Sequence, residues 1–156
     1  MTIAKKLQPH LAERGVEYKV LTHSPTPSAS RTAESSHISG NRIAKGVMLK
    51  DESGYLLALV PASHHIGLDE INSILGRNLK LATEEETCTL FPDCEVGAVP
   101  AIGAAYGLDV VMEESRARQP DIYFEGGDHT SLVHLSGEQF GKLMDTIQRG
   151  QFSHHQ

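Results

Sequence analysis

Aromatic residues and cysteine are scarce in this sequence. It has no tryptophan, 5% aromatic residues and only two cysteines among 156 residues. Cys88 and Cys94 have five residues between them, a spacing that fits neither a metal knuckle nor a CxxC redox pair. We therefore expect both to be reduced thiols in a cytoplasmic protein.

Long apolar runs are also lacking. No stretch approaches the roughly 18 consecutive apolar residues that a membrane-spanning helix needs. The first residues, MTIAKKLQPHLAERG, contain lysines but no apolar segment after them, so they do not form a signal peptide. The sequence thus predicts a cytoplasmic protein with no membrane partner.

Positive charge is in deficit, because the net charge is −6. A surface that follows a nucleic-acid backbone needs many lysine and arginine contacts. The basic residues here form only local groups, such as Arg116 and Arg118. We therefore expect no DNA partner, and any polynucleotide must be held locally or delivered by another protein.

A chain of this length, with 39% hydrophobic and 22% charged residues, fits a single globular domain. No internal repeat or linker is evident. We expect one domain over residues 1–150 and a frayed tail over residues 151–156. The periodicity of apolar residues predicts helices over residues 2–14, 30–37, 68–75, 83–90 and 136–147. It predicts strands over residues 16–21, 42–49, 55–60, 79–81, 106–112, 121–124 and 131–135, with 42–49 and 55–60 forming an antiparallel hairpin.

The stretch FPDCEVGAVPAIG, residues 91–103, combines two prolines and two glycines with small apolar residues. A solvated loop would be more polar, and a regular strand would not carry Pro100 near its centre. We interpret it as a semi-buried, tightly bent segment that could present backbone N–H groups to a ligand. The alternative is a bulged strand that enters a turn.

Lys45 interrupts the apolar strand RIAKGVML. A lysine in such a place must reach solvent, find a partner or have its pKa lowered by burial. Its stem could extend to an edge of the sheet. Alternatively, the ammonium faces a cleft, where it could hold a phosphate or a polarised carbonyl.

Three further segments carry polar side chains that suit a site. Asp128 and His129, in the turn GGDHT, are either an acid/base pair or the polar decoration of a hairpin turn. The loop from His23 to Ser28 could line the mouth of a pocket or be an ordinary surface connection. The pair His64-His65 does not predict a metal site, because adjacent side chains of an extended segment point to opposite faces.

Together these pieces resemble the YbaK/ProX-type domain, which is related to the editing domain of bacterial prolyl-tRNA synthetases. The resemblance lies in Ala44-Lys45 opening a hairpin, the strand end Leu59-Val60-Pro61-Ala62, the segment 90–103, and the strand and glycine turn 123–129. It covers roughly residues 7–147. One departure is that the first glycine of the family's G-x-x-x-P loop corresponds here to Val96, with Gly97 one step later.

The resemblance implies a mixed α/β (α+β) fold with a curved, partly barrel-like sheet and surrounding helices. It implies an aminoacyl-tRNA deacylase that clears mischarged tRNA in trans, without metal or organic cofactor. Its partners would be the 3′ end of an aminoacyl-tRNA and, secondly, an aminoacyl-tRNA synthetase. Lys45, Gly97 and Pro100 would be catalytic, and the substrate would be bound by His23, Ser28, Val99, Ala101, Ile102, Gly103, Gly127, Asp128 and His129.

The small side chains of Ala98 and Ala101 favour a small amino acid such as alanine, cysteine or serine, carried for example on tRNA for proline. Two other classes of function stay open. One is a binding module of the same fold that contacts an aminoacyl end or a synthetase without cleaving. The other is a hydrolase of a small ester that uses Asp128 and His129.

Overall fold

The structure, a computed structural model, describes residues 3–22, 38, 40–95, 98–114, 120–144 and 147–155. The helices are α1 (Leu7–Glu13), α3 (Leu68–Leu75), α4 (Glu84–Leu90) and α5 (Gly137–Leu143), with 3-10 turns η1 (Gly40–Arg42) and η2 (Ala104–Tyr106). The strands are β1 (Lys19–Thr22), β2 (Ala44–Asp51), β3 (Gly54–Pro61), β4 (His64–Ile66), β5 (Lys80–Leu81), β6 (Asp109–Glu113), β7 (Asp121–Glu125), β8 (Ser131–Ser136), β9 (Gln148–Gly150) and β10 (Ser153–His155).

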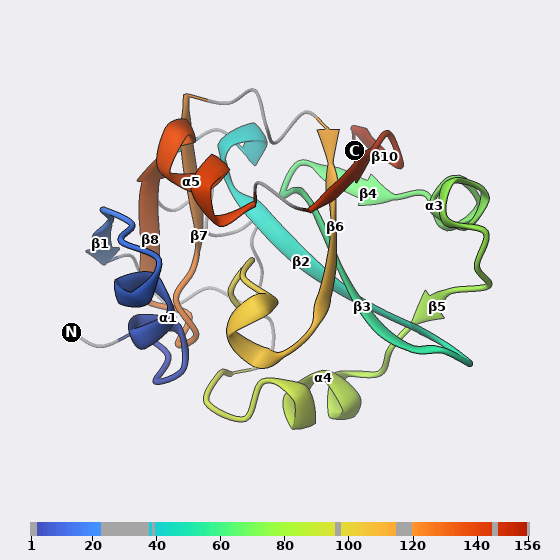
Figure 1. Ribbon diagram of the computed structural model, residues 1–156, viewed down its shortest axis with the longest axis horizontal. Helices are drawn as coiled ribbons and strands as arrows, with labels where there is room; N and C mark the ends of the chain where they lie inside the picture. The colour runs from blue at the N-terminus through green and yellow to red at the C-terminus, as the bar shows by residue number, and fades with distance from the viewer. Residues whose placement is uncertain are drawn as a thin grey trace.

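The strands form a five-stranded sheet in the order β5-β2-β3-β6-β9, a three-stranded sheet β1-β8-β7 and a pair β10-β4. Parallel and antiparallel neighbours both occur, since β3 runs antiparallel to β2 but parallel to β6. In Figure 1, α1 and α5 lie beside the three-stranded sheet, and α3 lies at the opposite end of the molecule. The predicted mixed α and β fold is confirmed, although the described sheets do not close into a barrel.

The β2–β3 hairpin is the centre of the larger sheet. Its register runs without interruption from Ala44 opposite Pro61 to Asp51 opposite Gly54, which confirms the antiparallel hairpin predicted from two apolar runs. A single parallel bridge between Ile43 and Tyr123 joins the start of this hairpin to β7 of the smaller sheet. The bridge brings the start of the hairpin next to β7, and the candidate site described below lies at this junction.

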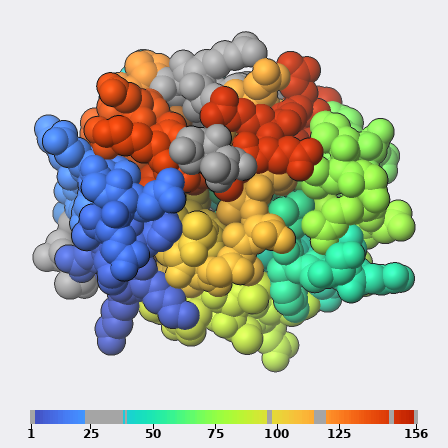
Figure 2. Space-filling view, in the orientation of Figure 1, coloured from blue at the N-terminus to red at the C-terminus, as the bar shows by residue number. Residues whose placement is uncertain are grey.

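Two apolar cores cover opposite faces of the larger sheet, because successive side chains of a strand alternate between faces. The first core contains Ala44 and Met48 of β2 and is closed by buried residues of α1 and α5, among them Leu7 and Phe140. The second core contains Leu49 of β2, together with residues of α3 and the C-terminal segment. In Figure 2, residues near 100–110 occupy the middle of the face that lies between the N-terminal residues and the β2–β3 hairpin.

The helix boundaries follow local chemistry. Pro9 falls in the first turn of α1, where its missing N–H costs nothing, so the helix is not broken there. Gly76 ends α3 in the left-handed conformation, with a φ of 64°. Thr83 and Glu86 form a capping box at the start of α4. At α5 the Ser136 hydroxyl accepts a hydrogen bond from the Gln139 N–H.

The end of the chain differs from the frayed tail predicted for residues 151–156. Ser153–His155 form β10, which pairs with β4, and Phe152 is fully buried in the second core. The same pairing explains why His64 and His65, which are in none of the predicted strands, lie in β4. The buried Phe152 and the pairing with β4 hold this segment in place. The sequence pattern does not reveal this, because both strands are short and lie far apart in the chain.

Candidate functional site

Lys45 is a half-buried cation at the open end of an apolar hairpin, the second residue of β2. It lies opposite Val60, on the face of β2 that also carries Val47 and Leu49 of the second core. Its Nζ donates a hydrogen bond of 2.7 Å to the carbonyl oxygen of His64. Burial lowers the pKa of the Lys45 ammonium. The Lys45 ammonium is therefore held by a backbone acceptor within the structure. The sequence alone did not decide between this environment and an exposed one.

Glu125, at the end of β7, is a buried carboxylate that the sequence reasoning missed, with only 4% of its surface exposed. The parallel bridge joins Ile43 to Tyr123, and Lys45 and Glu125 each follow two residues later. Alternation therefore places Lys45 and Glu125 on the same face of two adjoining strands. Charged side chains are seldom buried unless they are paired or functional. The only sequence signal is an acidic residue that ends an apolar strand just before two glycines.

The turn after Glu125 has an unusual backbone. His129 has a φ of 63°, a region that residues other than glycine rarely adopt. Its Nδ1 is buried and has no hydrogen-bond partner among the residues that the structure describes. Strained backbone and unsatisfied buried nitrogens concentrate at functional sites, because elsewhere they only cost stability. These two features make His129 a candidate site residue.

The Asp128 carboxylate, unlike the His129 ring, is fully engaged in hydrogen bonds within the turn. Its Oδ1 accepts from the N–H groups of Thr130 and Ser131 at 3.0 and 2.7 Å, and its Oδ2 accepts from the Ser131 hydroxyl at 3.0 Å. These hydrogen bonds hold the pKa of Asp128 below its usual range, against the opposing effect of burial. Asp128 therefore closes the turn on itself, which favours the interpretation of a structural turn residue over that of an acid/base partner for His129.

The predicted bent segment 91–103 is buried in its second half, whereas Pro92 and Glu95 near its start are exposed. Pro100, Ala101, Ile102 and Gly103 are buried, and Val99 packs against the first core. A Cβ on Gly103 would lie 2.5 Å from Val110 Cγ2, so only glycine fits there. The other predicted site residues His23, Ser28 and Gly97, and also Val96, lie outside the described residues.

The glycine turn meets the start of this segment. The Glu95 N–H donates to the Gly127 carbonyl at 2.8 Å, and the Ala4 N–H donates to the Gly126 carbonyl at 2.8 Å. A cavity of about 390 Å³ lies between these pieces. Its lining residues are Ile3, Ala4, Lys5, Pro92, Asp93, Gly126, Gly127 and Asp128.

The structure therefore brings part of the predicted site together. The glycine turn and the loop that begins the 91–103 segment are in contact, and Glu125 links this turn to the strand beside Lys45. Ala101 and Ile102, however, belong to the first core, whereas Lys45 is on the opposite face of β2. The glycine turn, Glu125 and the start of β2 come together at the end of β7, and we place the candidate site there.

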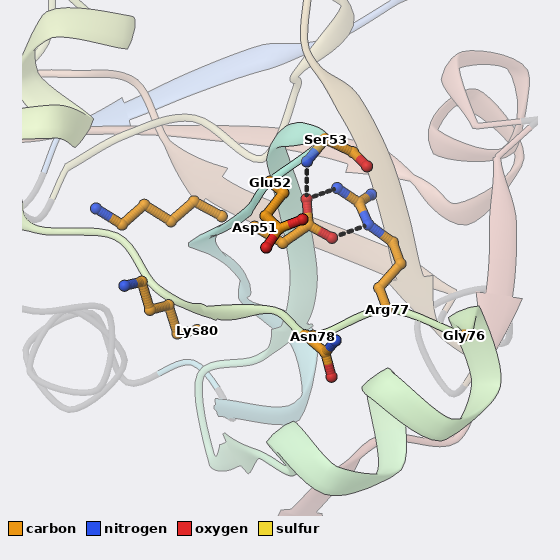
Figure 3. A pocket seen from close by; sticks show the side chains of 8 residues that line it. Asp51, Glu52, Ser53, Gly76, Arg77, Asn78 and Lys80 are labelled. Atoms are coloured by element: carbon orange, nitrogen blue, oxygen red, sulfur yellow. Dashed lines mark hydrogen bonds and ion pairs between the residues drawn. The ribbon is translucent and has the colours of Figure 1, made fainter.

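Another cavity, of about 630 Å³, lies by the turn of the β2–β3 hairpin and contains no predicted site residue (Figure 3). Two of its three cations, Arg77 and Lys50, are already paired with carboxylates. Arg77 donates to both oxygens of Asp51 at 2.6 and 2.7 Å, and Lys50 Nζ is 2.6 Å from Glu86 Oε1. We therefore do not assign the site to this cavity.

Within the described ranges, no group of three or more histidine, cysteine, aspartate or glutamate side chains is arranged to hold a metal ion. In the same ranges no helix is both long enough and apolar enough to span a membrane.

Comparison with solved structures establishes the fold. The hypothetical protein APE2540 superposes with a TM-score of 0.84 at 19% identity, over 96% of this chain and 100% of that one. A candidate trans-editing enzyme for prolyl-tRNA synthetase gives a TM-score of 0.80 at 24% identity, over 96% of both chains. A candidate signal transduction protein from Marinobacter aquaeolei VT8 gives 0.77 at 19% identity, over 95% of this chain and 30% of that one. A comparison with curated proteins finds no significant match.

The sequence model of the aminoacyl-tRNA editing domain matches residues 23–143. This range covers most of the chain and contains Lys45, Glu125 and the glycine turn. The chain belongs to the aminoacyl-tRNA editing domain family.

Proposed function

We propose that this protein is a deacylase that hydrolyses the ester between a small amino acid and the 3′ end of a mischarged tRNA, acting in trans in the cytoplasm. Membership of the editing-domain family supports the reaction class. The observation that carries the proposal is Lys45, a half-buried ammonium held at 2.7 Å by the His64 carbonyl within the matched range. A cation kept in an apolar strand costs stability, and a role in catalysis accounts for its presence.

The chemistry needs water to attack the ester carbonyl and an oxyanion to be stabilised as it forms. An ammonium has three donors. One is used on His64, so two remain for the terminal phosphate or for the carbonyl oxygen of the substrate. Glu125, on the same face, is suited to the α-ammonium of the aminoacyl group. The 3′ oxygen of the tRNA then leaves and takes up a proton.

Additional binding would come from the two predicted loops. The backbone N–H groups of Gly97 and Val99 would contact the aminoacyl end. Pro100 and Gly103 would fix the bend, and Ala101 and Ile102, which belong to the first core, would support the loop from behind. His129 offers a ring nitrogen from the glycine turn. Positioning of this kind can supply a large part of the barrier reduction without a nucleophilic triad.

The substrate that we propose is small, and alanine, cysteine or serine on tRNA for proline fits best. Ala98 and Ala101, both fully buried, belong to the predicted pocket loop, and their small side chains support this choice. A synthetase separates side chains that differ by one methylene by only about 10- to 200-fold, so a second site that selects on size has a purpose. One solved structure with this fold is described as a candidate trans-editing enzyme for prolyl-tRNA synthetase, which supports the choice of tRNA for proline. We propose a synthetase as the second partner.

The first experiment is deacylation of a panel of mischarged tRNAs by the wild type and by Lys45→Ala. The panel includes Ala-, Cys- and Ser-tRNA with the proline anticodon, and one bulky amino acid. We expect one small substrate to be cleaved fastest. Loss of a single electrostatic donor typically lowers kcat by about 10²- to 10³-fold, and we expect Lys45→Ala to fall in this range.

Lys50→Ala is the matched control, because Lys50 is on the same strand but bonds to Glu86 by the far end of the hairpin. It should retain the wild-type rate within about threefold, because the Lys50–Glu86 bond lies at the other end of the hairpin from Lys45. If folded wild-type protein cleaves nothing at high concentration, the proposal fails and the non-catalytic binding module replaces it. A rate that depends on His129 but not on Lys45 would instead favour the small-ester hydrolase.

A further inference from the structure

The C-terminal segment, residues 148–155, lies against the strand that supplies the acceptor for Lys45. In β10, Ser153 pairs with Ile66 and His154 with His65 of β4. Phe152, just before β10, has no exposed surface and lies in the second core with Val60, the residue opposite Lys45. The chain end is therefore packed on the same face as Lys45.

Two hydrogen bonds run from this segment to the two ends of β4. Ser153 Oγ is 2.8 Å from His64 Nδ1. The Phe152 carbonyl accepts from the Gly67 N–H at 2.6 Å. His64 begins β4 and Gly67 follows its last residue, so the segment fixes the strand at both ends.

The segment is itself anchored by Glu113, a carboxylate with 5% of its surface exposed at the end of β6. Glu113 Oε1 accepts from the backbone N–H groups of Phe152 and Ser153 at 3.0 and 3.1 Å. Hydrogen bonds to an ionised acceptor are about twice as strong as neutral ones. A continuous set of contacts thus leads from Glu113 through Ser153 to His64, whose carbonyl binds Lys45.

We propose that the C-terminal segment positions the Lys45 ammonium for catalysis, with Glu113 and Ser153 as positioning residues that act through His64. This inference rests on the proposed function, since that function gives Lys45 its role. Lysine has a flexible four-carbon stem, and its ammonium has no fixed direction of its own. A misplacement of about 1 Å can cost about 100-fold in rate, so the acceptor that orients Lys45 must itself be held.

The experiment uses the full-length chain with Ser153→Ala and Glu113→Ala. Glu113→Gln is the conservative variant, because its amide oxygen can still accept both backbone bonds. Ser63→Ala is the matched control, since the Ser63 hydroxyl, in the turn before β4, donates to Asn41 Oδ1 at 2.6 Å and not to the C-terminal segment. Circular dichroism and the unfolding midpoint verify that each variant is folded.

The first readout needs no substrate. Trace acetylation with acetic anhydride, followed by mass spectrometry, measures the reactivity of Lys45 relative to the exposed Lys19. We expect a change of about three- to tenfold in this ratio for Ser153→Ala and Glu113→Ala, and the wild-type ratio for Glu113→Gln and Ser63→Ala. The second readout is deacylation, where we expect kcat to fall about three- to tenfold and KM to stay within about twofold.

A wild-type Lys45 ratio in both folded variants would overturn the inference, whatever the activity. So would an equal change at every lysine, which would mean general loosening of the fold. If the wild type cleaves no substrate, the proposed function fails, and the acetylation ratios still decide whether the segment positions Lys45. Restoration of the wild-type ratio in Glu113→Gln separates a hydrogen-bonding role from mere packing.

Discussion

At the scale of single residues, the candidate site combines three groups that are each unfavourable for folding. Burial lowers the pKa of the Lys45 ammonium, and Glu125 is a buried carboxylate on the same face. His129 has a positive φ, which residues other than glycine rarely adopt. Each would destabilise an ordinary surface turn or strand. Their grouping around the end of β7 is the physical reason to place the site there.

Gly127 gives the residue-scale prediction. It has a φ of 114°, and a Cβ there would lie 3.1 Å from Ala4 Cβ and 3.3 Å from Cys94 Sγ. We expect Gly127→Ala to lower the free energy of unfolding by about 1–3 kcal/mol, because backbone strain and crowding both act on it. Urea unfolding of the variant and the wild type measures this difference.

Gly141 in α5 is the matched control, since its Cβ would meet nothing within 4 Å and its φ is not positive. Gly141→Ala should raise the unfolding free energy by about 0.5–1 kcal/mol, because alanine loses less backbone entropy in a helix. Equal effects from the two substitutions would contradict the assignment of the glycine turn as a strained, closely packed site.

At the scale of elements, α4 is fastened to the hairpin by one carboxylate. Glu86 receives hydrogen bonds of 2.6 Å from both Lys50 and Tyr55, and its capping bond to the Thr83 N–H is 3.1 Å. These hydrogen bonds, that from Lys50 first, lower the pKa of Glu86 from 4.5 to about 2. Because the folded pKa is depressed, the contribution to stability is present above the unfolded pKa and is lost as the pH falls toward the folded one.

We therefore expect Glu86→Gln to destabilise the protein most at pH 6 and progressively less between pH 4.5 and about 2. Urea unfolding at several pH values measures the difference from the wild type. Glu84→Gln, in the same first turn but with an exposed side chain, should show little of this dependence. A pH-independent difference for Glu86→Gln would mean that the ion pair with Lys50 contributes nothing.

The sequence predicts elements whose signals are local and misses those that depend on distant partners. The hairpin that contains Lys45 follows from two apolar runs and the turn between them, and α4 follows from its capping box. By contrast, β10 is three residues long and pairs with an equally short β4 far away in the chain, so neither strand has a pattern of its own. Glu125 was missed for the same reason, because only the bridge between Ile43 and Tyr123 brings it beside Lys45.

At the scale of the whole molecule, the net charge of −6 limits how the protein can hold tRNA. Two of the cations by the hairpin turn, Lys50 and Arg77, are already paired with carboxylates. Lys45 is the cation that the proposed function aims at a phosphate or carbonyl of the substrate. Recognition must then depend on the aminoacyl end and on a few contacts, and a long basic surface plays no part.

We accordingly expect uncharged tRNA to bind weakly, with a plot of log K against log salt concentration that is shallower than about −2. The slope is about −0.7 to −0.9 for each phosphate contact, so one or two contacts give this value. Lys45→Ala should reduce the magnitude of the slope by about one if Lys45 binds the terminal phosphate, and should leave it unchanged if Lys45 acts on the ester carbonyl. Fluorescence anisotropy over a salt series separates these cases. Tight binding with a steep slope would show instead that a phosphate-binding surface exists, and the protein would then need no synthetase to deliver its substrate.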